Sequence, residues 1–228
     1  ENEVKKHKLA LLGKERLDHF VGIWVNRNAK RKRPNDVLLS WQLFLDELYK
    51  SEGHKNATLV MHTEPTDQEG PNLFAVAERL GIKDNICFSR DRIEFDKMNV
   101  LHNISDSCIN ISYAEGFGLA TLESMKCGKP IIATKTGGLT RQVVDHRDSS
   151  TNGIALDIEL QSLVGSQQVP YIFEDYVSAH TIADAIYDMY SMEKSEREAL
   201  GKKAREYVES EFNHQTTIDL WHDSLTQL

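Results

Sequence analysis

Short, continuous apolar runs recur along the first two thirds of the chain. Five of them have the length of a strand, and they cover residues 20–25, 57–61, 85–89, 108–111 and 130–133. Segments with apolar residues at helical spacing follow each run, at residues 36–49, 73–80, 95–104, 118–127 and 140–145. This alternation predicts βαβ units and a parallel sheet. Because the runs are continuous, we expect helices on both faces of the sheet, as in a doubly wound α/β fold.

The pattern differs at the two ends of the chain. Residues 1–19 are predicted to be a helix or linker, because they carry no clear core pattern. Residues 154–173 resemble an irregular hairpin with Gly165 near its turn, and helical segments follow at about 179–192, 196–212 and 215–225. We therefore predict one domain over residues 20–228, which ends in helices.

Composition excludes several classes of protein. Charged residues make up 27% of the chain and hydrophobic residues 40%, as in ordinary globular domains. The net charge of −8 disfavours a nucleic-acid-binding protein. No apolar run approaches the ~20 residues of a membrane span. The charged N-terminal segment lacks the apolar stretch of a signal peptide. Three widely spaced cysteines argue against a disulfide framework or a zinc site, so a cytoplasmic location is expected.

A cluster of cations follows the first predicted strand. Arg27, Lys30, Arg31, Lys32 and Arg33 occupy five of seven consecutive positions. Taken alone, the cluster could be a solvated charge run. However, the carboxyl ends of parallel strands share one edge of the sheet, and such sheets bind their ligands there. The position of the cluster at that edge favours an anionic ligand.

Other unusual features are expected at the same edge. Arg90 follows the third strand, residues 115–118 follow the fourth, and the pair Gly137 and Gly138 follows the fifth. Glycines at a strand-to-helix turn allow the backbone to approach a ligand closely, and the N–H groups of the helix start then face an anion. Two such turns at adjacent strand ends strengthen the prediction of a binding site.

Two glutamates flank the turn that follows the fourth strand. Glu115 precedes it, and Glu123 lies eight positions later in the next predicted helix. On a helical wheel Glu123 falls within an apolar arc, where an unpaired carboxylate is costly. The arc is formed by Leu119, Ala120, Leu122, Met125 and Cys127. Glu123 therefore either pairs with Lys126 one turn on or accepts hydrogen bonds from a ligand diol.

Residues 112–134 read SYAEGFGLATLESMKCGKPIIAT and are followed by Gly137 and Gly138. This stretch resembles the E-x7-E signature of retaining GT-B glycosyltransferases. It is most similar to the large family, glycosyltransferase family 4-like, that includes sucrose synthase-like enzymes and bacterial mannosyl- and glucosyltransferases. The resemblance extends over roughly residues 20–153. It implies a Rossmann-like domain that forms the donor-binding half of a GT-B enzyme, with residues 1–19 as an interdomain linker.

The resemblance implies a role for each matching residue. Glu115 would contact hydroxyls of the donor sugar, helped by the backbone at Phe117 and Gly118, while Glu123 would hold the ribose diol. Arg27, with either Lys32 or Arg33, would neutralise the diphosphate and stabilise the leaving group. The implied catalytic residues are Arg27, Arg33 and Glu115, and the implied donor-binding residues are Lys32, Arg90, Gly116, Phe117, Gly118, Leu119, Glu123, Gly137 and Gly138. No metal or other cofactor is expected, because cations and a helix N-terminus supply the electrostatic stabilisation.

The chain departs from the family pattern in four respects. It has Asn26-Arg27 where the family has Gly-Arg, and its lysine lies within a run of cations. Residues 157–176 form a longer segment than usual, without an assigned function. The resemblance implies that an acceptor-binding domain comes first in this class of enzyme, and we expect it to be missing from this chain, since no segment before Phe20 is long enough to form it.

The predicted function is therefore that of a donor-binding domain. It would bind a UDP- or GDP-linked sugar for a retaining hexosyltransferase, with transfer to an unspecified glycan, lipid or protein requiring the N-terminal domain. A nucleotide-sugar epimerase with the same two-domain layout is one alternative. A non-catalytic module that docks an acidic partner or RNA through the basic run 27–33 is another.

Overall fold

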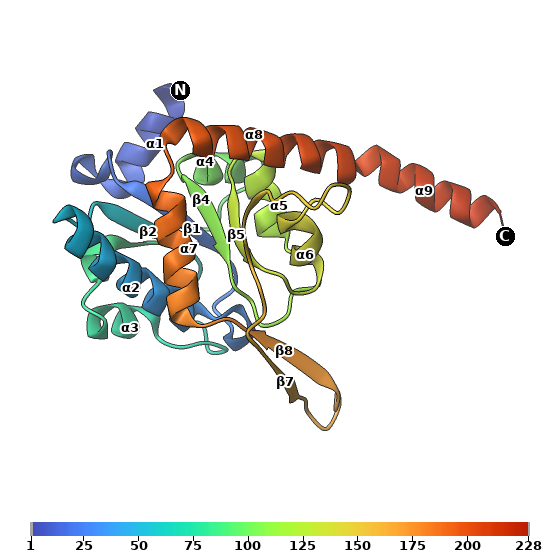
Figure 1. Cartoon of the computed structure of the whole chain (residues 1–228), viewed down its shortest axis with the longest axis horizontal. Coiled ribbons are helices and arrows are strands. Elements are labelled where there is room, and N and C mark those ends of the chain that lie inside the picture. The colour runs from blue at the N-terminus through green and yellow to red at the C-terminus, as the bar shows by residue number, and fades with distance from the viewer. Residues whose placement is uncertain (1, 228) are drawn as a thin grey trace.

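A six-stranded parallel sheet forms the centre of the molecule (Figure 1). The computed structural model describes residues 2–227, apart from the side chains of Asn2 and Phe95. The strands are β1 (Phe20–Val25), β2 (Ala57–His62), β3 (Ile86–Ser89), β4 (Ser107–Asn110), β5 (Ile131–Thr134) and β6 (Gly153–Leu156). Their order across the sheet is β3-β2-β1-β4-β5-β6, so the winding reverses between β1 and β4. The doubly wound, Rossmann-like α/β fold predicted from the sequence is confirmed.

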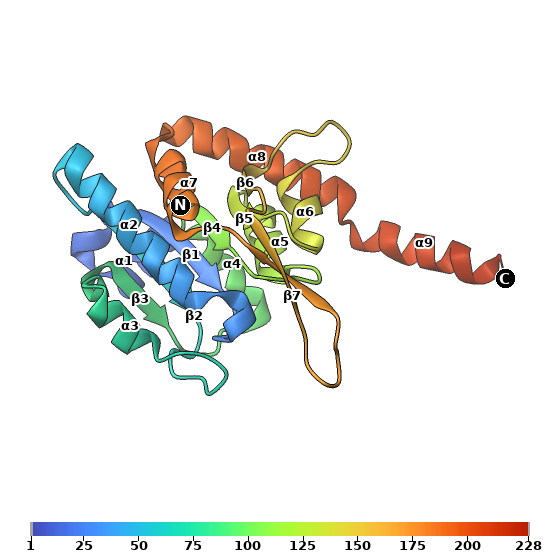
Figure 2. The same ribbon diagram turned by 60° about the horizontal axis from the view of Figure 1, so that its bottom comes forward.

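Helices cover both faces of the sheet, as the continuous apolar strands predict (Figures 1 and 2). One layer contains α2 (Pro34–Glu52), α3 (Leu73–Arg79) and α7 (Ala179–Ser191). The other contains α1 (Asn2–Leu12), α4 (Met98–Asn103), α5 (Leu119–Lys126), α6 (Gly138–Val143) and α8 (Lys194–Glu211). Short 3₁₀ helices are η1 (Lys14–Arg16), η2 (Lys30–Lys32), η3 (Lys83–Asn85) and η4 (Phe95–Lys97).

The first helix belongs to this layered body. Leu12 of α1 is buried in the same apolar cluster as residues of α4 and α8. Of the two structures predicted for residues 1–19, a helix or a linker, Asn2–Leu12 form the helix. The role of this segment as an interdomain linker stays a prediction.

Strand β1 shows how one strand serves both layers. Phe20 and Trp24 belong to the cluster that includes α2, while Val21 and Ile23 belong to the opposite cluster. Gly22 lies on the Phe20 side, where the ring of Trp41 packs directly on the backbone. A Cβ at Gly22 would lie 2.7 Å from Cζ3 of Trp41. The helix can approach the sheet this closely because the strand carries no side chain there.

The structure corrects the prediction for residues 154–173. Residues 153–156 form β6, which extends the main sheet beside β5. The hairpin begins later, with β7 (Leu160–Val164) and β8 (Ile172–Tyr176) paired antiparallel around a turn that contains Gly165. It projects away from the body (Figures 1 and 2). The four residues of β6 are too short an apolar run to be separated from the hairpin by pattern alone.

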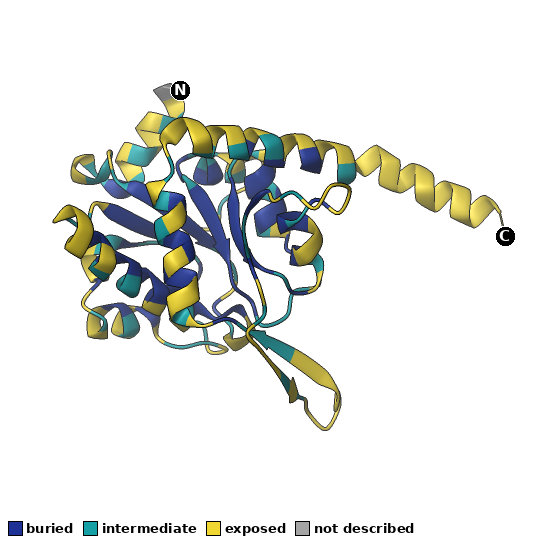
Figure 3. Ribbon diagram, viewed as in Figure 1, coloured by how far each residue is buried: buried dark blue, intermediate teal, exposed yellow. Residues whose placement is uncertain are grey.

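Three helices end the chain, as predicted. In α8 the buried side chains include Ala204, Tyr207 and Val208, which pack on the α5 side of the sheet. The last helix, α9 (His214–Thr226), has no buried residue and extends away from the body (Figure 3). Trp221 on this helix is 65% exposed. Within residues 2–227, no helix combines the length and apolarity that a bilayer crossing requires.

Gly22→Ala tests the close approach between α2 and the sheet. The added methyl group would overpack against Trp41, and we expect the free energy of unfolding to fall by about 1–3 kcal/mol. Urea unfolding of the variant measures this loss. In a Trp41→Phe background the same substitution should cost less, because phenylalanine lacks the outer ring carbons that crowd the site. An equal cost in both backgrounds would contradict the packing argument.

Candidate functional site

Several of the predicted site residues come together at the carboxyl edge of the sheet, where β1 and β4 lie side by side. Connections leave these two strands in opposite directions, which opens a crevice between them. A cavity of about 360 Å³ lies there, and we call it the central cavity. It is lined by Val25, Asn26, Lys32, Asn110, Glu115, Phe117, Gly118, Leu119, Ala120 and Glu123. The turns after β1 and β4 thus build one site.

Lys32 and Glu115 form an ion pair in the wall of the central cavity. The two side chains are only 9% and 10% exposed. Lys32 ends η2, the tight turn in which its N–H donates to the carbonyl of Ala29 at 2.9 Å. Burial lowers the pKa of the Lys32 ammonium, and the Glu115 carboxylate opposes this shift. Removing one partner of such a pair is costly, whereas a ligand that offers both a charge and hydroxyls can replace both.

The loop that follows Glu115 presents backbone N–H groups to the same cavity. The N–H groups of residues 117–120 donate no hydrogen bond to any described residue. Gly118 caps the start of α5 with φ 89°, a conformation that glycine adopts without strain. A Cβ at Gly116 would meet no atom within 4 Å, so this glycine faces open space. Free N–H groups at a helix start are suited to bind an anion.

Gly137 and Gly138 support this loop from behind and are absent from the lining of the central cavity. Gly137 has φ 47°, and a Cβ on it would lie 2.0 Å from the carbonyl oxygen of Glu115. The N–H of Gly138 donates to that oxygen at 3.0 Å. The side-chain amide of Gln142 in α6 donates to the carbonyl of Phe117 at 2.6 Å. The structure therefore places the two predicted glycines in contact with the loop, on the side away from the cavity.

Glu123 lies at the rim of the central cavity with its side chain 31% exposed. The apolar arc predicted around it is wrong at Leu119, which is 66% exposed, because the first turn of α5 faces the cavity. The alternative pairing with Lys126 is also wrong: among the described residues, no ion pair joins Lys126 to Glu123. The partner is His102 of α4, whose Nε2 lies 3.4 Å from Oε2 of Glu123.

Two asparagines add unpaired donors to the cavity wall. The Nδ2 atoms of Asn26 and Asn110 are buried and have no hydrogen-bond partner among residues 2–227. Both residues line the central cavity, at the ends of β1 and β4. Buried polar groups are normally paired, so these two amides are available to donate to a water molecule or to a ligand oxygen.

A second hollow of about 390 Å³ adjoins the central cavity and shares Val25 and Asn26 with it. Arg27 and Arg90 both line it. The Arg27 side chain is 61% exposed and pairs with two acids of the β2–α3 loop, Asp67 at 2.8 Å and Glu69 at 2.9 Å. The hydrogen bond that Arg27 donates to the Asp67 carboxylate raises the pKa of the Arg27 guanidinium. Nη2 of Arg90 lies 3.5 Å from Oε2 of Glu64.

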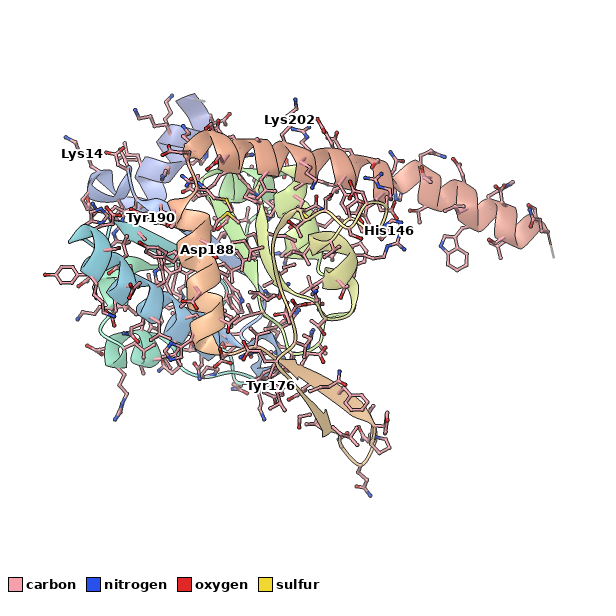
Figure 4. All side chains as sticks on the ribbon, viewed as in Figure 1. Lys14, His146, Tyr176, Asp188, Tyr190 and Lys202 are labelled. Atoms are coloured by element: carbon pink, nitrogen blue, oxygen red, sulfur yellow. The ribbon has the colours of Figure 1, made fainter. Side chains whose placement is uncertain are left out.

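Arg33 does not line either hollow. Its Nε donates to Asp36 and its Nη2 to the carbonyl of Val177, each at 2.9 Å. The guanidinium also lies over the rings of Tyr113 and Tyr176, 4.8 Å and 5.8 Å from their centroids. Tyr176 marks the base of the hairpin (Figure 4). Of the two alternatives for the second cation, the structure places Lys32 in the central cavity and Arg33 at the hairpin.

Sequence reasoning missed several residues of this site. They are Asn110, His102, Asp67 and Glu69. His102 lies 21 positions before its partner, and Asp67 lies 40 positions after Arg27. No periodicity or motif connects residues at such separations, so only the folded chain shows these contacts.

Comparison with known proteins identifies the family. Residues 13–207 match the family described as glycosyl transferases group 1. The chain is 33% identical over 143 residues to D-inositol 3-phosphate glycosyltransferase 2 of Catenulispora acidiphila, covering 58% of this chain and 31% of that protein. It is 34% identical over 153 residues to D-inositol 3-phosphate glycosyltransferase of Paenarthrobacter aurescens, covering 67% of this chain and 31% of that protein. The chain thus matches about a third of the length of these relatives.

Solved structures share the fold. HepE of Anabaena in complex with UDP and glucose superposes with a TM-score of 0.73 at 18% identity, covering 100% of this chain and 53% of that one. Sucrose-phosphate synthase of Thermosynechococcus elongatus superposes with a TM-score of 0.70 at 20% identity, covering 98% of this chain and 49% of that one. The C-terminal domain of a group 1 glycosyl transferase, LpcC of Francisella tularensis, superposes with a TM-score of 0.63 at 19% identity. This match covers 91% of this chain and 93% of that one.

Because the family match extends over most of the chain and the fold agrees, the chain belongs to the glycosyl transferases group 1 and has the architecture of the C-terminal domain of a GT-B glycosyltransferase.

Proposed function

We propose that this chain binds a nucleoside-diphosphate sugar, UDP- or GDP-linked, as the donor domain of a retaining hexosyltransferase. The observation that carries the proposal is the composition of the central cavity. One cavity holds a buried cation, a helix start with free N–H groups and two carboxylates, from Lys32, the loop 117–120, Glu115 and Glu123. A diphosphate, a sugar and a ribose together match these groups in charge and hydrogen-bonding capacity.

In this proposal each part of the donor has its own partners. The diphosphate lies between Lys32, Arg27 and the N–H groups of the loop. Glu123 accepts from the ribose diol, and Glu115 accepts from hydroxyls of the transferred sugar. The relatives named D-inositol 3-phosphate glycosyltransferase and the neighbour solved with UDP and glucose support a nucleotide-sugar donor.

Both cations of the proposed diphosphate site are paired with acids in this structure. Lys32 pairs with Glu115, and Arg27 pairs with Asp67 and Glu69. Binding of the donor would exchange these carboxylates for phosphate oxygens. The same exchange would release Glu115 to accept from sugar hydroxyls, which couples recognition of the diphosphate to recognition of the sugar. During transfer, the cations would stabilise the charge that develops on the departing nucleoside diphosphate.

The state of the basic run argues against a general docking surface. Within residues 27–33, Lys32 and Arg33 are buried and Arg27 is paired with two acids. An RNA or an acidic protein would find mainly Lys30 and Arg31 exposed.

The transferase activity itself would require an acceptor-binding domain. We place the reaction in the cytoplasm, where nucleotide sugars and free thiols coexist.

Calorimetry with UDP and GDP tests the proposal. We expect the chain to bind one of them weakly and to transfer no sugar alone. In Lys32→Met the affinity for this nucleotide should fall by about 10- to 100-fold, because a hydrogen bond to a charged group contributes about 1.5–3 kcal/mol. Lys50→Met, at an exposed lysine on α2, is the matched control and should bind normally. Absence of UDP and GDP binding, in this chain and in a longer protein that contains an acceptor domain, would refute the proposal.

A second prediction concerns the acids that pair with Arg27. The double variant Asp67→Asn and Glu69→Gln removes both ion pairs of Arg27, so that its guanidinium can bind phosphate without first leaving a carboxylate. The affinity for UDP should rise by up to about fivefold for each ion pair removed, because an exposed ion pair contributes about 0.2–1 kcal/mol. The double variant Glu47→Gln and Glu78→Gln changes the net charge equally at exposed positions. Equal gains in both double variants would attribute the effect to net charge rather than to release of Arg27.

A further inference from the structure

The contact between His102 and Glu123 has no role in the family signature or in the function proposed above. His102 is fully buried, and its Nε2 lies 3.4 Å from Oε2 of Glu123. Its other ring nitrogen, Nδ1, is buried without a hydrogen-bond partner among the described residues. Glu123 is therefore the only hydrogen-bond partner of this imidazole within residues 2–227. An apolar side chain would fill the same space without leaving a polar atom unpaired.

The backbone of His102 is held firmly in place. The Ser105 hydroxyl and N–H both donate to the His102 carbonyl, at 2.8 Å and 3.2 Å. Leu101 and Ile104, on either side, are buried in the core layer that also contains Leu122 of α5. The imidazole thus comes from a fixed element and reaches the carboxylate of a different helix.

The two faces of the Glu123 carboxylate lie in different surroundings. Oε2 is in contact with the buried imidazole, while the side chain lines the central cavity and is 31% exposed. A carboxylate can accept about four hydrogen bonds, so a single bond from Nε2–H leaves room for two hydroxyl donors from the cavity side. A glutamate at a cavity rim otherwise samples several rotamers, and fixing them on binding lowers affinity.

We propose that His102 is a positioning residue: its Nε2–H holds the Glu123 carboxylate in the orientation that accepts from both hydroxyls of the donor ribose. This inference rests on the proposed function, because it assumes that a ribose lies at Glu123. His102 itself touches no part of the ligand. Its contribution is to fix the carboxylate in advance, so that less conformational entropy is lost when the nucleotide binds.

Two conservative variants separate positioning from packing. In His102→Gln the side-chain amide nitrogen can occupy the place of Nε2 and still donate to Glu123. In His102→Asn the amide nitrogen reaches only to the place of Nδ1 and cannot. Both substitutions put a neutral polar amide into the same buried site, so they are matched in polarity, and thermal unfolding reports any loss of stability separately.

The measurement is the ratio of the dissociation constants of 2′-deoxy-UDP and UDP, with 2′-deoxy-GDP and GDP as the equivalent pair. Wild type should bind the ribose form more tightly, and His102→Gln should keep this ratio. His102→Asn should reduce the ratio toward that of Glu123→Gln and weaken UDP binding by roughly 2- to 12-fold, the range expected for one unfixed side chain. In a Glu123→Gln background, His102→Asn should have no further effect on the ratio.

Other outcomes overturn the inference in distinguishable ways. A His102→Asn variant that melts earlier but keeps the wild-type ratio would show a packing role and refute positioning alone. A wild-type protein that binds UDP without preferring ribose would refute both the assignment of Glu123 and the role of His102. A wild-type protein that binds none of the four nucleotides would refute the proposed function first.

Discussion

Burial of both faces of the parallel sheet is the constraint on which the rest of this structure depends. Helices cover each face, so the strands carry apolar side chains in both directions and neither face of the sheet is open to a ligand. The polar groups of the site lie at the carboxyl ends of the strands and in the turns that follow them. The winding reverses between β1 and β4, and the turns that leave these strands separate and open the central cavity. The location of the site is thus a consequence of topology.

Charge compensation is the second organising feature. In a chain with a net charge of −8, two of the cations that face the hollows are paired with acids from other turns, Lys32 with Glu115 and Arg27 with Asp67 and Glu69. A buried cation without such a partner would be costly in the free protein. The pairing keeps the site stable without a ligand, and it defines which contacts an anionic ligand has to replace.

Several contacts support this site on the side away from the central cavity. Gly137 and Gly138 pack against the backbone of the loop after β4, and His102 contacts Glu123 from the buried side. Arg33 joins the turn after β1 to the start of α7 and the base of the hairpin through Val177 and Tyr176. The residues that the sequence predicts as ligand contacts therefore form two groups. One group faces the central cavity, and the other packs behind the cavity-facing residues and supports them.

The amino-acid pattern alone predicts the fold class, the edge of the sheet that carries the site, and the loop from Glu115 to Glu123, because continuous apolar runs and a glycine turn reflect backbone geometry over a few residues. It could not separate β6 from the hairpin, choose between Lys32 and Arg33, or find the partner of Glu123. Adjacent residues of one turn leave in different directions, so Lys32 faces the cavity while Arg33 faces the hairpin. His102 meets Glu123 only after α4 and α5 pack together. Side-chain direction and contacts between distant elements depend on how the helices and strands pack, so they become visible only in the folded chain.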